Sequence, residues 1–446
     1  MLLYWHKHTY NFWQKMKKLE HLSDLLAGLA PQECVVVHSA AAHPTVLARQ
    51  LAESARLLDG RRVHSLLPYG PVPYAQDPAR AHLRLSTFLP GSGLRGALDA
   101  GRLEVRREPL SEAPRLFGAA GPVGLALLRV APPDDSGRVN LGVSVDYMPA
   151  AIRAARRVVA EIDPRMPRVA GDAWLSADAI DAFVEAADGP HEVLSGEPDA
   201  VDEAIAGHVA SLLDDGAVLQ LGAGSLPDRV LAKLQHLRHL GLHTGIIGDG
   251  AWPLIERGII DNSTKEVLPG VCVATMAVGS RAFYAFMDRN PAIELHPCSV
   301  THRGDVLRRL GRLHAINSAL QVDLHGRVNA EWAGARQVSS PGGLPDFSRA
   351  AASLAGGRSI IALRARDRKG QSAIVPALPA GRPCSLQPAE VDCYVTEYGV
   401  AAVRGCSAEA RRNALIAIAD PEYRDALRRG DQDVLRIDTA PRSAAP

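Results

Sequence analysis

Short runs of β-branched and other apolar residues alternate with helix-patterned segments along most of this 446-residue chain. The run at 33–40 (ECVVVHSA) precedes an apolar repeat of helical spacing over 43–58. Further strand-like runs follow at 61–68 and 124–131, and the latter ends at a pair of prolines. Strands that alternate with helices favour parallel pairing, so this rhythm predicts an open, mostly parallel sheet with helices on its faces.

The segment 144–163 (SVDYMPAAIRAARRVVAEID) is predicted as a single helix. Its Ala, Ile and Val residues repeat at helical spacing. Ser144 or Asp146 stands where a side chain caps a helix N-terminus, because both residue types accept hydrogen bonds from the first free N–H groups.

The strand–helix rhythm restarts after a stretch at 187–204 that is crowded with Gly, Pro, Glu and Asp. Residues 210–234 are typical of a helix end, a strand, a Gly-rich loop and a second helix, and a hairpin is predicted around 324–326. We therefore predict two α/β domains with the linker at 187–204. The expected parts are an N-terminal extension (1–22), a first domain (23–195), a second domain (196–432) and a frayed tail (433–446).

Charge and composition exclude several classes of protein. There are 50 Lys and Arg residues against 49 Asp and Glu residues, whereas a protein that binds nucleic acid needs a basic face. The chain has no continuous apolar run of membrane-spanning length and no recognisable secretory signal. The six cysteines are scattered, with no C-x-x-C pair, which favours free thiols in a reducing cytoplasm.

The strongest local motif is LQLGAGSLPD (219–228), in which an apolar strand runs into G-x-G-x-x-P and then a helix. Glycines let backbone N–H groups approach a ligand, and a helix N-terminus favours negative charge. A dinucleotide-binding loop is one interpretation, although Pro227 replaces the third glycine of that fingerprint. A tight turn without a ligand is the other.

Two weaker patterns also bear on chemistry. The paired glycines Gly342 and Gly343 could direct N–H groups into a cavity as an oxyanion hole does, or could form an ordinary loop. His236, His239 and His243 have a spacing seen in metal sites. We predict no metal there, because Gly241 interrupts the helix and no Cys or carboxylate completes the ligand set.

The order of motifs resembles the acetyl-CoA hydrolase/transferase family, which includes 4-hydroxybutyrate, butyrate and acetate CoA-transferases. The resemblance extends over about residues 25–430. The matching segments are VAPPD through Gly137, LGVSVD, MPR, LQLGAGSLPD, LGLHTGIIGDG, HAINSALQVDLHGRV, GGLPDF, SAIVP, VTEYGVAAVRG and ALIAIADPEYR. It implies two open-sheet α/β domains of the NagB/RpiA/CoA-transferase-like type, an interdomain cleft for acyl-CoA and a homo-oligomeric assembly.

The sequence departs from this family at the catalytic position. The family's nucleophilic glutamate follows a His-Thr pair, and here the segment reads Leu242-His243-Thr244-Gly245-Ile246. Ser340-Pro341 precedes the paired glycines where the family tends to have glycine, and Ala373 stands where the family has arginine in its Ser-Arg-Ile motif. Gly245 has no side chain, so no covalent glutamyl-CoA thioester forms at this position.

Several side chains are candidates for roles around the vacant position. The catalytic-site candidates are Gly245 itself, His243, Asp249 and Glu397. Glu256 and Glu294 are further carboxylates, and His243, His296 and His302 are candidate general bases. The resemblance implies CoA contacts from Gly222, Ala223, Gly224, Ser225, Leu226, Asn317, Gly342, Gly343 and Ser372. Coenzyme A is expected as part of the substrate, and no permanently bound cofactor is expected.

Three functions remain open at this point. The first is an acyl-CoA-dependent enzyme that passes the acyl group to water or another acceptor by proximity and oxyanion stabilisation. The second is a CoA-transferase with a relocated carboxylate, such as Asp249, whose alternative role is to form a turn or cap a helix. The third is a non-catalytic CoA-binding homologue.

Overall fold

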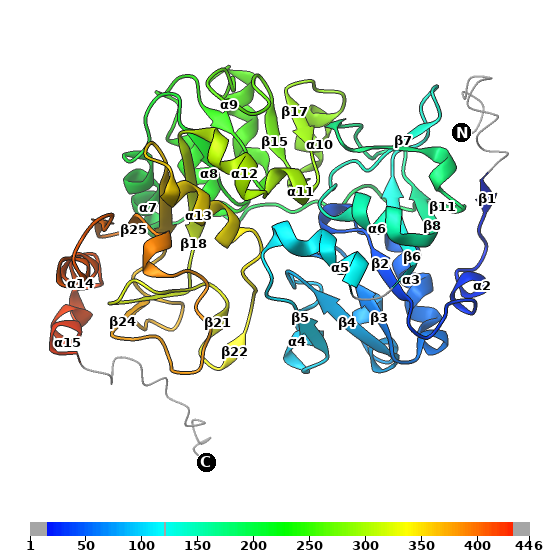
Figure 1. Cartoon of the computed structure of the whole chain (residues 1–446), viewed down its shortest axis with the longest axis horizontal. Coiled ribbons are helices and arrows are strands. Elements are labelled where there is room, and N and C mark those ends of the chain that lie inside the picture. The colour runs from blue at the N-terminus through cyan, green and yellow to red at the C-terminus, as the bar shows by residue number, and fades with distance from the viewer. Residues whose placement is uncertain (1–15, 120–121, 431–446) are drawn as a thin grey trace, which may run out of the picture.

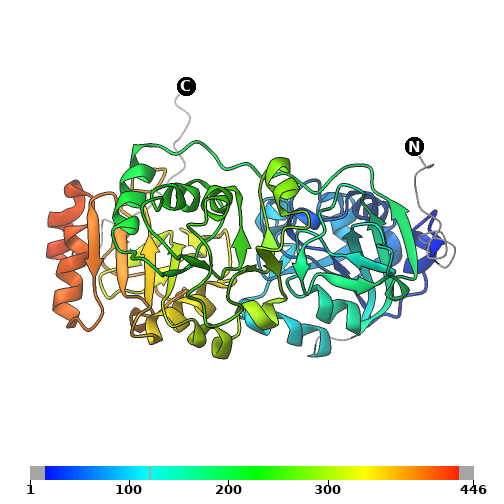
Figure 2. The ribbon, with the colours of Figure 1, turned by 90° about the horizontal axis from the view of Figure 1, so that it is seen from above.

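The computed structural model describes residues 16–119 and 122–430 (Figure 1). The predicted tail at 433–446 and most of the predicted N-terminal extension lie outside these residues. In the described ranges, no helix combines the length and apolar character needed to cross a bilayer. The two halves of the chain lie end to end along the long axis of the molecule (Figure 2).

The first half forms an eight-stranded sheet in which all neighbours are parallel, with the order β1-β11-β8-β6-β2-β3-β4-β5. Its strands are β1 (Lys17–Lys18), β2 (Cys34–Val37), β3 (Arg61–His64), β4 (Leu83–Thr87), β5 (Leu103–Val105), β6 (Val123–Val130), β8 (Ala155–Ile162) and β11 (Ala182–Glu185). Its helices are α2 (Ser23–Leu26), α3 (Thr45–Glu53), α4 (Arg95–Asp99), α5 (Ala113–Ala119) and α6 (Met148–Ala154). Strand β6 is buried along its whole length, as expected for a central parallel strand.

The prediction of one helix over 144–163 is wrong in its second half. Helix α6 ends at Ala154, and the chain continues directly as β8, which pairs with β6 and β11 at the centre of the sheet. The β-branched pair Val158 and Val159 fits a buried strand as well as a helix, and sheet pairing decides between them. Asp146 does not cap α6; its carboxylate accepts hydrogen bonds from the Ser39 and Ser144 hydroxyls.

The second half forms a six-stranded sheet with the order β13-β12-β18-β23-β25-β26, parallel except for the last pair. Its strands are β12 (Val218–Gln220), β13 (Gly241–Leu242), β18 (Leu313–Ser318), β23 (Arg358–Ala362), β25 (Cys393–Thr396) and β26 (Gly399–Ala402). The helices are α7 (Ala200–Ala210), α8 (Ser225–Ala232), α9 (Trp252–Glu256), α10 (Arg281–Met287), α11 (Cys298–Thr301), α12 (Gly304–Leu307), α13 (Leu344–Ser353), α14 (Ala408–Ala417) and α15 (Arg424–Arg429).

Small sheets complete the fold. One of them, in the order β15-β17-β9, joins the two halves, because β9 comes from the first half and its partners come from the second. The predicted hairpin around 324–326 is formed by β19 and β20, which pair antiparallel. The strands of these sheets are β7 (Arg138–Asn140), β9 (Ala170–Gly171), β10 (Trp174–Ser176), β14 (Ile246–Ile247), β15 (Cys272–Ala274), β16 (Met276–Ala277), β17 (Ile293–Leu295), β19 (Gln321–Asp323), β20 (Val328–Asn329), β21 (Trp332–Ala333), β22 (Arg336–Gln337) and β24 (Ile374–Val375).

A buried arginine holds the end of β6 to the segment that leaves the first sheet. The Arg129 side chain is fully buried, and its Nε lies 2.9 Å from Asp163 Oδ2. Its Nη2 lies 2.8 Å from Asp188 Oδ1, just after β11. Loss of the guanidinium leaves buried carboxylate charge without a partner, which is strongly destabilising.

We therefore expect Arg129→Met to lower the free energy of unfolding by about 3–5 kcal/mol. The matched control is Arg157→Met, which removes a half-exposed ion pair with Asp181 and is expected to cost about 0–1 kcal/mol. Urea unfolding followed by circular dichroism measures both. Equal losses in the two variants would contradict this role for Arg129.

Candidate active site

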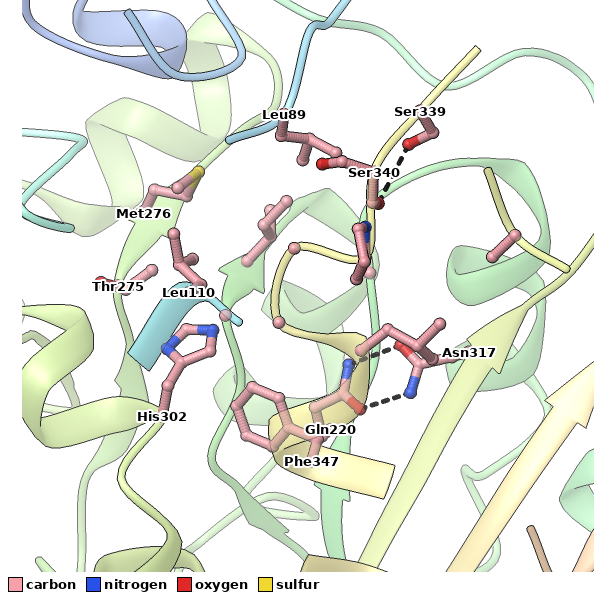
Figure 3. A pocket seen from close by; sticks show the side chains of 18 of the residues that line it. Leu89, Leu110, Gln220, Thr275, Met276, His302, Asn317, Ser339, Ser340 and Phe347 are labelled. Carbon is pink, nitrogen blue, oxygen red and sulfur yellow. Dashed lines mark hydrogen bonds between the residues drawn. The ribbon is translucent and has the colours of Figure 1, made fainter. Parts of the chain in front are cut away.

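A cavity of about 250 Å³ lies between the two halves of the chain (Figure 3). Three leucines of the first half, Leu66, Leu89 and Leu110, form part of its wall. The rest comes from strand ends and loops of the second half, including the turn after β12, the segment after β13 and the loop before α13. The two predicted glycine loops therefore meet at one cavity.

The paired glycines stand where α13 begins. Gly342 has a φ of +55°, a conformation that favours glycine, and Gly343 is the N-cap residue of α13. Within the described part of the chain, neither of their N–H groups donates to another backbone or side-chain group. Free N–H groups at a helix N-terminus favour negative charge, so this loop can stabilise an oxyanion.

Contacts from the first half hold this loop in place. The N–H of Leu110 donates to the carbonyl oxygen of Gly342 at 3.0 Å. Ser111 donates through its N–H and its hydroxyl to the carboxylate of Asp346, in the first turn of α13. The hydroxyl of Ser340 donates to the carbonyl oxygen of Phe88. The position of the glycine pair thus depends on both halves of the chain.

Gly245 follows β13 and lines the same cavity. Its carbonyl oxygen accepts hydrogen bonds from the N–H groups of Thr275 and Met276, which fixes the backbone at this point. A Cβ atom built on Gly245 would lie 3.1 Å from His302 Nε2. The space beside Gly245 is therefore occupied by an imidazole ring.

His302 is almost completely buried and forms part of the cavity wall. Its Nδ1 lies 2.7 Å from the hydroxyl oxygen of Thr301. Its ring packs edge-on against Phe347, with the ring centroids 4.8 Å apart. Burial lowers the pKa of His302 to about 3, because a charged imidazolium would lose its hydration there. The ring is therefore neutral at ordinary pH.

The remaining polar groups of the cavity are uncharged. The side-chain amides of Gln220 and Asn317 donate to each other, at 3.2 Å from Gln220 and 2.9 Å from Asn317 (Figure 3). The described residues that line the cavity include no Asp, Glu, Lys or Arg. The site is thus a cavity whose described lining side chains carry no charge at ordinary pH and are largely apolar.

Family models match both halves of the chain. The acetyl-CoA hydrolase/transferase N-terminal domain matches residues 6–195, and the C-terminal domain of the same family matches residues 279–430. The chain belongs to the acetyl-CoA hydrolase/transferase family. This confirms the family that the motifs predict.

Relatives within the acetyl-CoA hydrolase/transferase family match most of the chain. A 4-hydroxybutyrate coenzyme A transferase of Clostridium kluyveri is 36% identical over 88% of this chain and 92% of its own length. The crystal structure of a 4-hydroxybutyrate CoA-transferase from Porphyromonas gingivalis is 31% identical, with a TM-score of 0.79 over 94% of this chain and 98% of that one. RipA from Yersinia pestis is 28% identical, with a TM-score of 0.88 over 95% of this chain and 98% of that one. The two-domain α/β fold is thereby confirmed.

The other catalytic candidates lie outside the cavity wall in this family member. His243 is fully buried behind it, with Nε2 3.0 Å from the carbonyl oxygen of Thr301, and burial lowers its pKa to about 3. The Asp249 carboxylate accepts hydrogen bonds from the N–H and hydroxyl of Ser280. Glu397 accepts from the N–H of Ala365 at 2.9 Å. Gly245 and His302 therefore line the cavity, whereas His243, Asp249 and Glu397 do not.

Some of the residues that are predicted to contact CoA line the cavity, and others do not. Gly222, Asn317, Gly342 and Gly343 line the cavity. Ala223, Gly224, Ser225 and Leu226 lie outside the cavity wall. Gly224 is the N-cap residue of α8, and Ser225 and Leu226 are its first two residues. The Ser372 hydroxyl donates to the carbonyl oxygen of Ile374 and is also outside the wall. For these residues a contact with CoA stays a prediction.

The remaining candidates have partners of their own. His296 lies between Asp172 and Glu294, with nitrogen–oxygen distances of 2.9 and 2.8 Å. His236 contacts the carbonyl oxygen of Lys233, and His239 contacts Asp261, so neither ring joins His243. Glu256 is the last residue of α9 and is not part of the cavity wall.

Sequence reasoning missed the first-half leucines and Gln220. Gln220 ends β12 directly before the Gly-rich turn, and that position is a signal that could have pointed to it. Leu66, Leu89 and Leu110 carry no such signal, because ordinary apolar residues become cavity walls only when the two halves meet.

The two glycine positions allow a direct test of this packing. A Cβ on Gly343 would lie 2.6 Å from His302 Nε2, whereas a Cβ on Gly222 would contact nothing within 4 Å. We expect Gly343→Ala to destabilise the protein by about 1–3 kcal/mol through overpacking. Gly222→Ala is expected to stay within about 0.5 kcal/mol of wild type. Thermal unfolding of both variants measures this, and an unaffected Gly343→Ala would show that His302 does not occupy this place.

Proposed function

We propose that this protein is an enzyme that transfers an acyl group from a CoA thioester to water or another acceptor without a glutamyl-CoA intermediate. One observation carries the proposal: Gly245 lines the same cavity as Gly342 and Gly343, whose N–H groups have no partner in the described part of the chain, and none of the described residues in its wall is a carboxylate. Membership of a family of CoA-transferases and hydrolases supports the substrate class.

The cavity is suited to direct transfer. The carbonyl oxygen of a bound thioester can take up hydrogen bonds from the N–H groups at Gly342 and Gly343, which strengthen as negative charge develops on it. An acceptor held beside the carbonyl carbon then attacks with the advantage of proximity. Binding of the distant CoA nucleotide can contribute to the same barrier reduction.

The alternative function, a CoA-transferase in which another carboxylate replaces the missing glutamate, has little support. Asp249 and Glu397 each accept hydrogen bonds from backbone N–H groups outside the cavity wall, and Glu294 contacts His296. To act as a nucleophile, any of them would have to leave these partners and enter an apolar cavity. Homo-oligomeric assembly, a cytoplasmic location and the absence of nucleic-acid partners stay predictions from the sequence.

The cavity wall also indicates the kind of acyl group. Leu66, Leu89, Leu110 and Met276 are apolar, and no cationic side chain of the described residues lines the cavity. An acyl chain that ends in a carboxylate would be desolvated there without a counter-charge. We therefore propose that the enzyme prefers short uncharged acyl chains.

Turnover without a covalent CoA adduct is the first expected result. The purified protein is mixed with a panel of acyl-CoA thioesters, and release of free CoA thiol is followed with and without amine, alcohol and thiol acceptors. Borohydride or hydroxylamine is added to parallel samples to trap any enzyme thioester, and intact mass is measured. We expect thiol release and an unmodified mass.

A trapped adduct at any carboxylate would overturn the proposal in favour of a CoA-transferase. CoA binding by calorimetry with no turnover of any thioester would favour a non-catalytic homologue. If the protein bound no CoA species at all, the proposed acyl transfer and the CoA-transferase alternative would both be wrong.

A second expectation concerns acyl charge. Butyryl-CoA and succinyl-CoA have the same number of acyl carbons and differ at the terminal methyl or carboxylate. We expect kcat/KM for butyryl-CoA to exceed that for succinyl-CoA by about 10²-fold or more, because a buried unpaired charge costs several kcal/mol. Steady-state thiol release measures the ratio. A ratio near one would show that the acyl group lies elsewhere.

A further inference from the structure

The imidazole of His302 stands between the two glycine positions that define the cavity. Ideal Cβ atoms on Gly245 and Gly343 would lie 3.1 and 2.6 Å from its Nε2. The ring therefore fills the space that side chains at both positions would need. Nε2 is the ring atom that lies nearest to both of these Cβ positions, and His302, Gly342 and Gly343 all line the cavity.

The hydroxyl of Thr301 is the hydrogen-bond partner of the Nδ1 atom of His302. The hydroxyl oxygen lies 2.7 Å from Nδ1 and 3.4 Å from the carbonyl oxygen of Pro297. The hydroxyl has one proton to donate, and we assign it to the shorter of these two contacts. With the hydroxyl as donor, Nδ1 accepts and the proton of the neutral ring sits on Nε2.

The surroundings of His302 keep the ring in this neutral form. Burial alone lowers its pKa, to about 3. His243 is the titratable group beside it and is likewise neutral, because burial lowers its pKa to about 3. Asp346 lies in the first turn of α13, next to the cavity, and burial raises its pKa to about 6.

We propose that His302 is a catalytic hydrogen-bond donor whose Nε2–H, together with the free N–H groups of the Gly342–Gly343 loop, stabilises the oxyanion of the acyl-CoA thioester. This inference rests on the proposed acyl transfer. The acceptor is water or an uncharged hydroxyl, amine or thiol. Its lone pair forms a bond to the carbonyl carbon, and the carbonyl π electrons move onto the oxygen that His302 contacts.

Collapse of this tetrahedral adduct re-forms the carbonyl and breaks the C–S bond. The bonding pair leaves with the sulfur of CoA, and the proton lost by the acceptor balances the charge to give the free CoA thiol. His302 keeps its proton throughout. A donor that stays neutral suits this role, while its low basicity makes it a poor general base.

Two substitutions separate the donor role from a base role. His302→Gln places an amide N–H near the position of Nε2, and His302→Leu removes the donor at similar volume. Because loss of one oxyanion donor costs about 10²–10³-fold in kcat, we expect that loss in the leucine variant and retention within about 10-fold in the glutamine variant. His64→Leu is the matched control, since His64 is also buried and edge-on to a phenylalanine ring but lies outside the cavity wall.

The outcomes are separable. Turnover by His302→Leu equal to that of wild type would overturn the role of His302 and leave the proposed function standing. Absence of turnover in wild type itself would instead refute the proposed function. A glutamine variant that unfolds at the wild-type temperature but is as slow as the leucine variant would show that His302 acts as a base.

The pH dependence gives an independent readout. The pH profile of kcat/KM is recorded between about pH 5 and 8 for wild type and His302→Gln. A limb near pH 6 from Asp346 would be common to both proteins. We expect their ratio to be constant, because His302 stays neutral above its pKa of about 3. A ratio that changes with pH would show that His302 titrates during the reaction and would overturn the donor role.

Thr301→Val tests the positioning residue. It removes the hydroxyl that contacts Nδ1 while keeping the shape of the side chain. We expect kcat to fall while KM is nearly unchanged, since only the stabilisation of the transition state is reduced. A rise in KM with unchanged kcat would contradict this role.

Discussion

The site depends on one packing constraint, which is that an imidazole fills the space that side chains at two glycine positions would need. Gly245 and Gly343 come from different loops, and neither could carry an ordinary side chain without displacing His302. The ring is desolvated by this packing, and desolvation keeps it neutral. A cavity that the family resemblance associates with a charged nucleophile is therefore an uncharged cavity with fixed donors. The proposed chemistry follows from this difference in charge.

The scaffold explains how such a site keeps its geometry. Strand β9 crosses into a sheet of the second half, and Arg107 of the first half makes a two-pronged ion pair with the buried Glu331 of the second, at 2.8 Å for each bond. At the same interface, the N–H of Leu110 donates a hydrogen bond to the carbonyl oxygen of Gly342. Donors that are held in place before the substrate binds need no reorganisation during the reaction, and this is the main advantage of a preorganised site.

Much of the fold could be predicted from local patterns, because strand and helix periodicity is a local property. The passage from β12 through the Gly-rich turn to α8 and the β19–β20 hairpin are examples. The segment 144–163 shows the limit, since Val158 and Val159 lie in a strand only because β6 and β11 are there to pair with β8. The position of His302 beside Gly245 could not be predicted from the sequence, because it depends on the packing of loops that are far apart in the chain. Nothing in the sequence around Asp249 or Glu397 shows that backbone N–H groups hold these carboxylates outside the cavity wall.

The most direct measurement is a crystal structure with a ketone analogue of acyl-CoA, in which a methylene group separates the sulfur from the carbonyl. The account predicts that the carbonyl oxygen lies within about 3.2 Å of His302 Nε2 and of an N–H group of the Gly342–Gly343 loop. The carbonyl carbon should have no carboxylate near it. A carboxylate oxygen within about 3.5 Å of that carbon, poised for attack, would contradict the account.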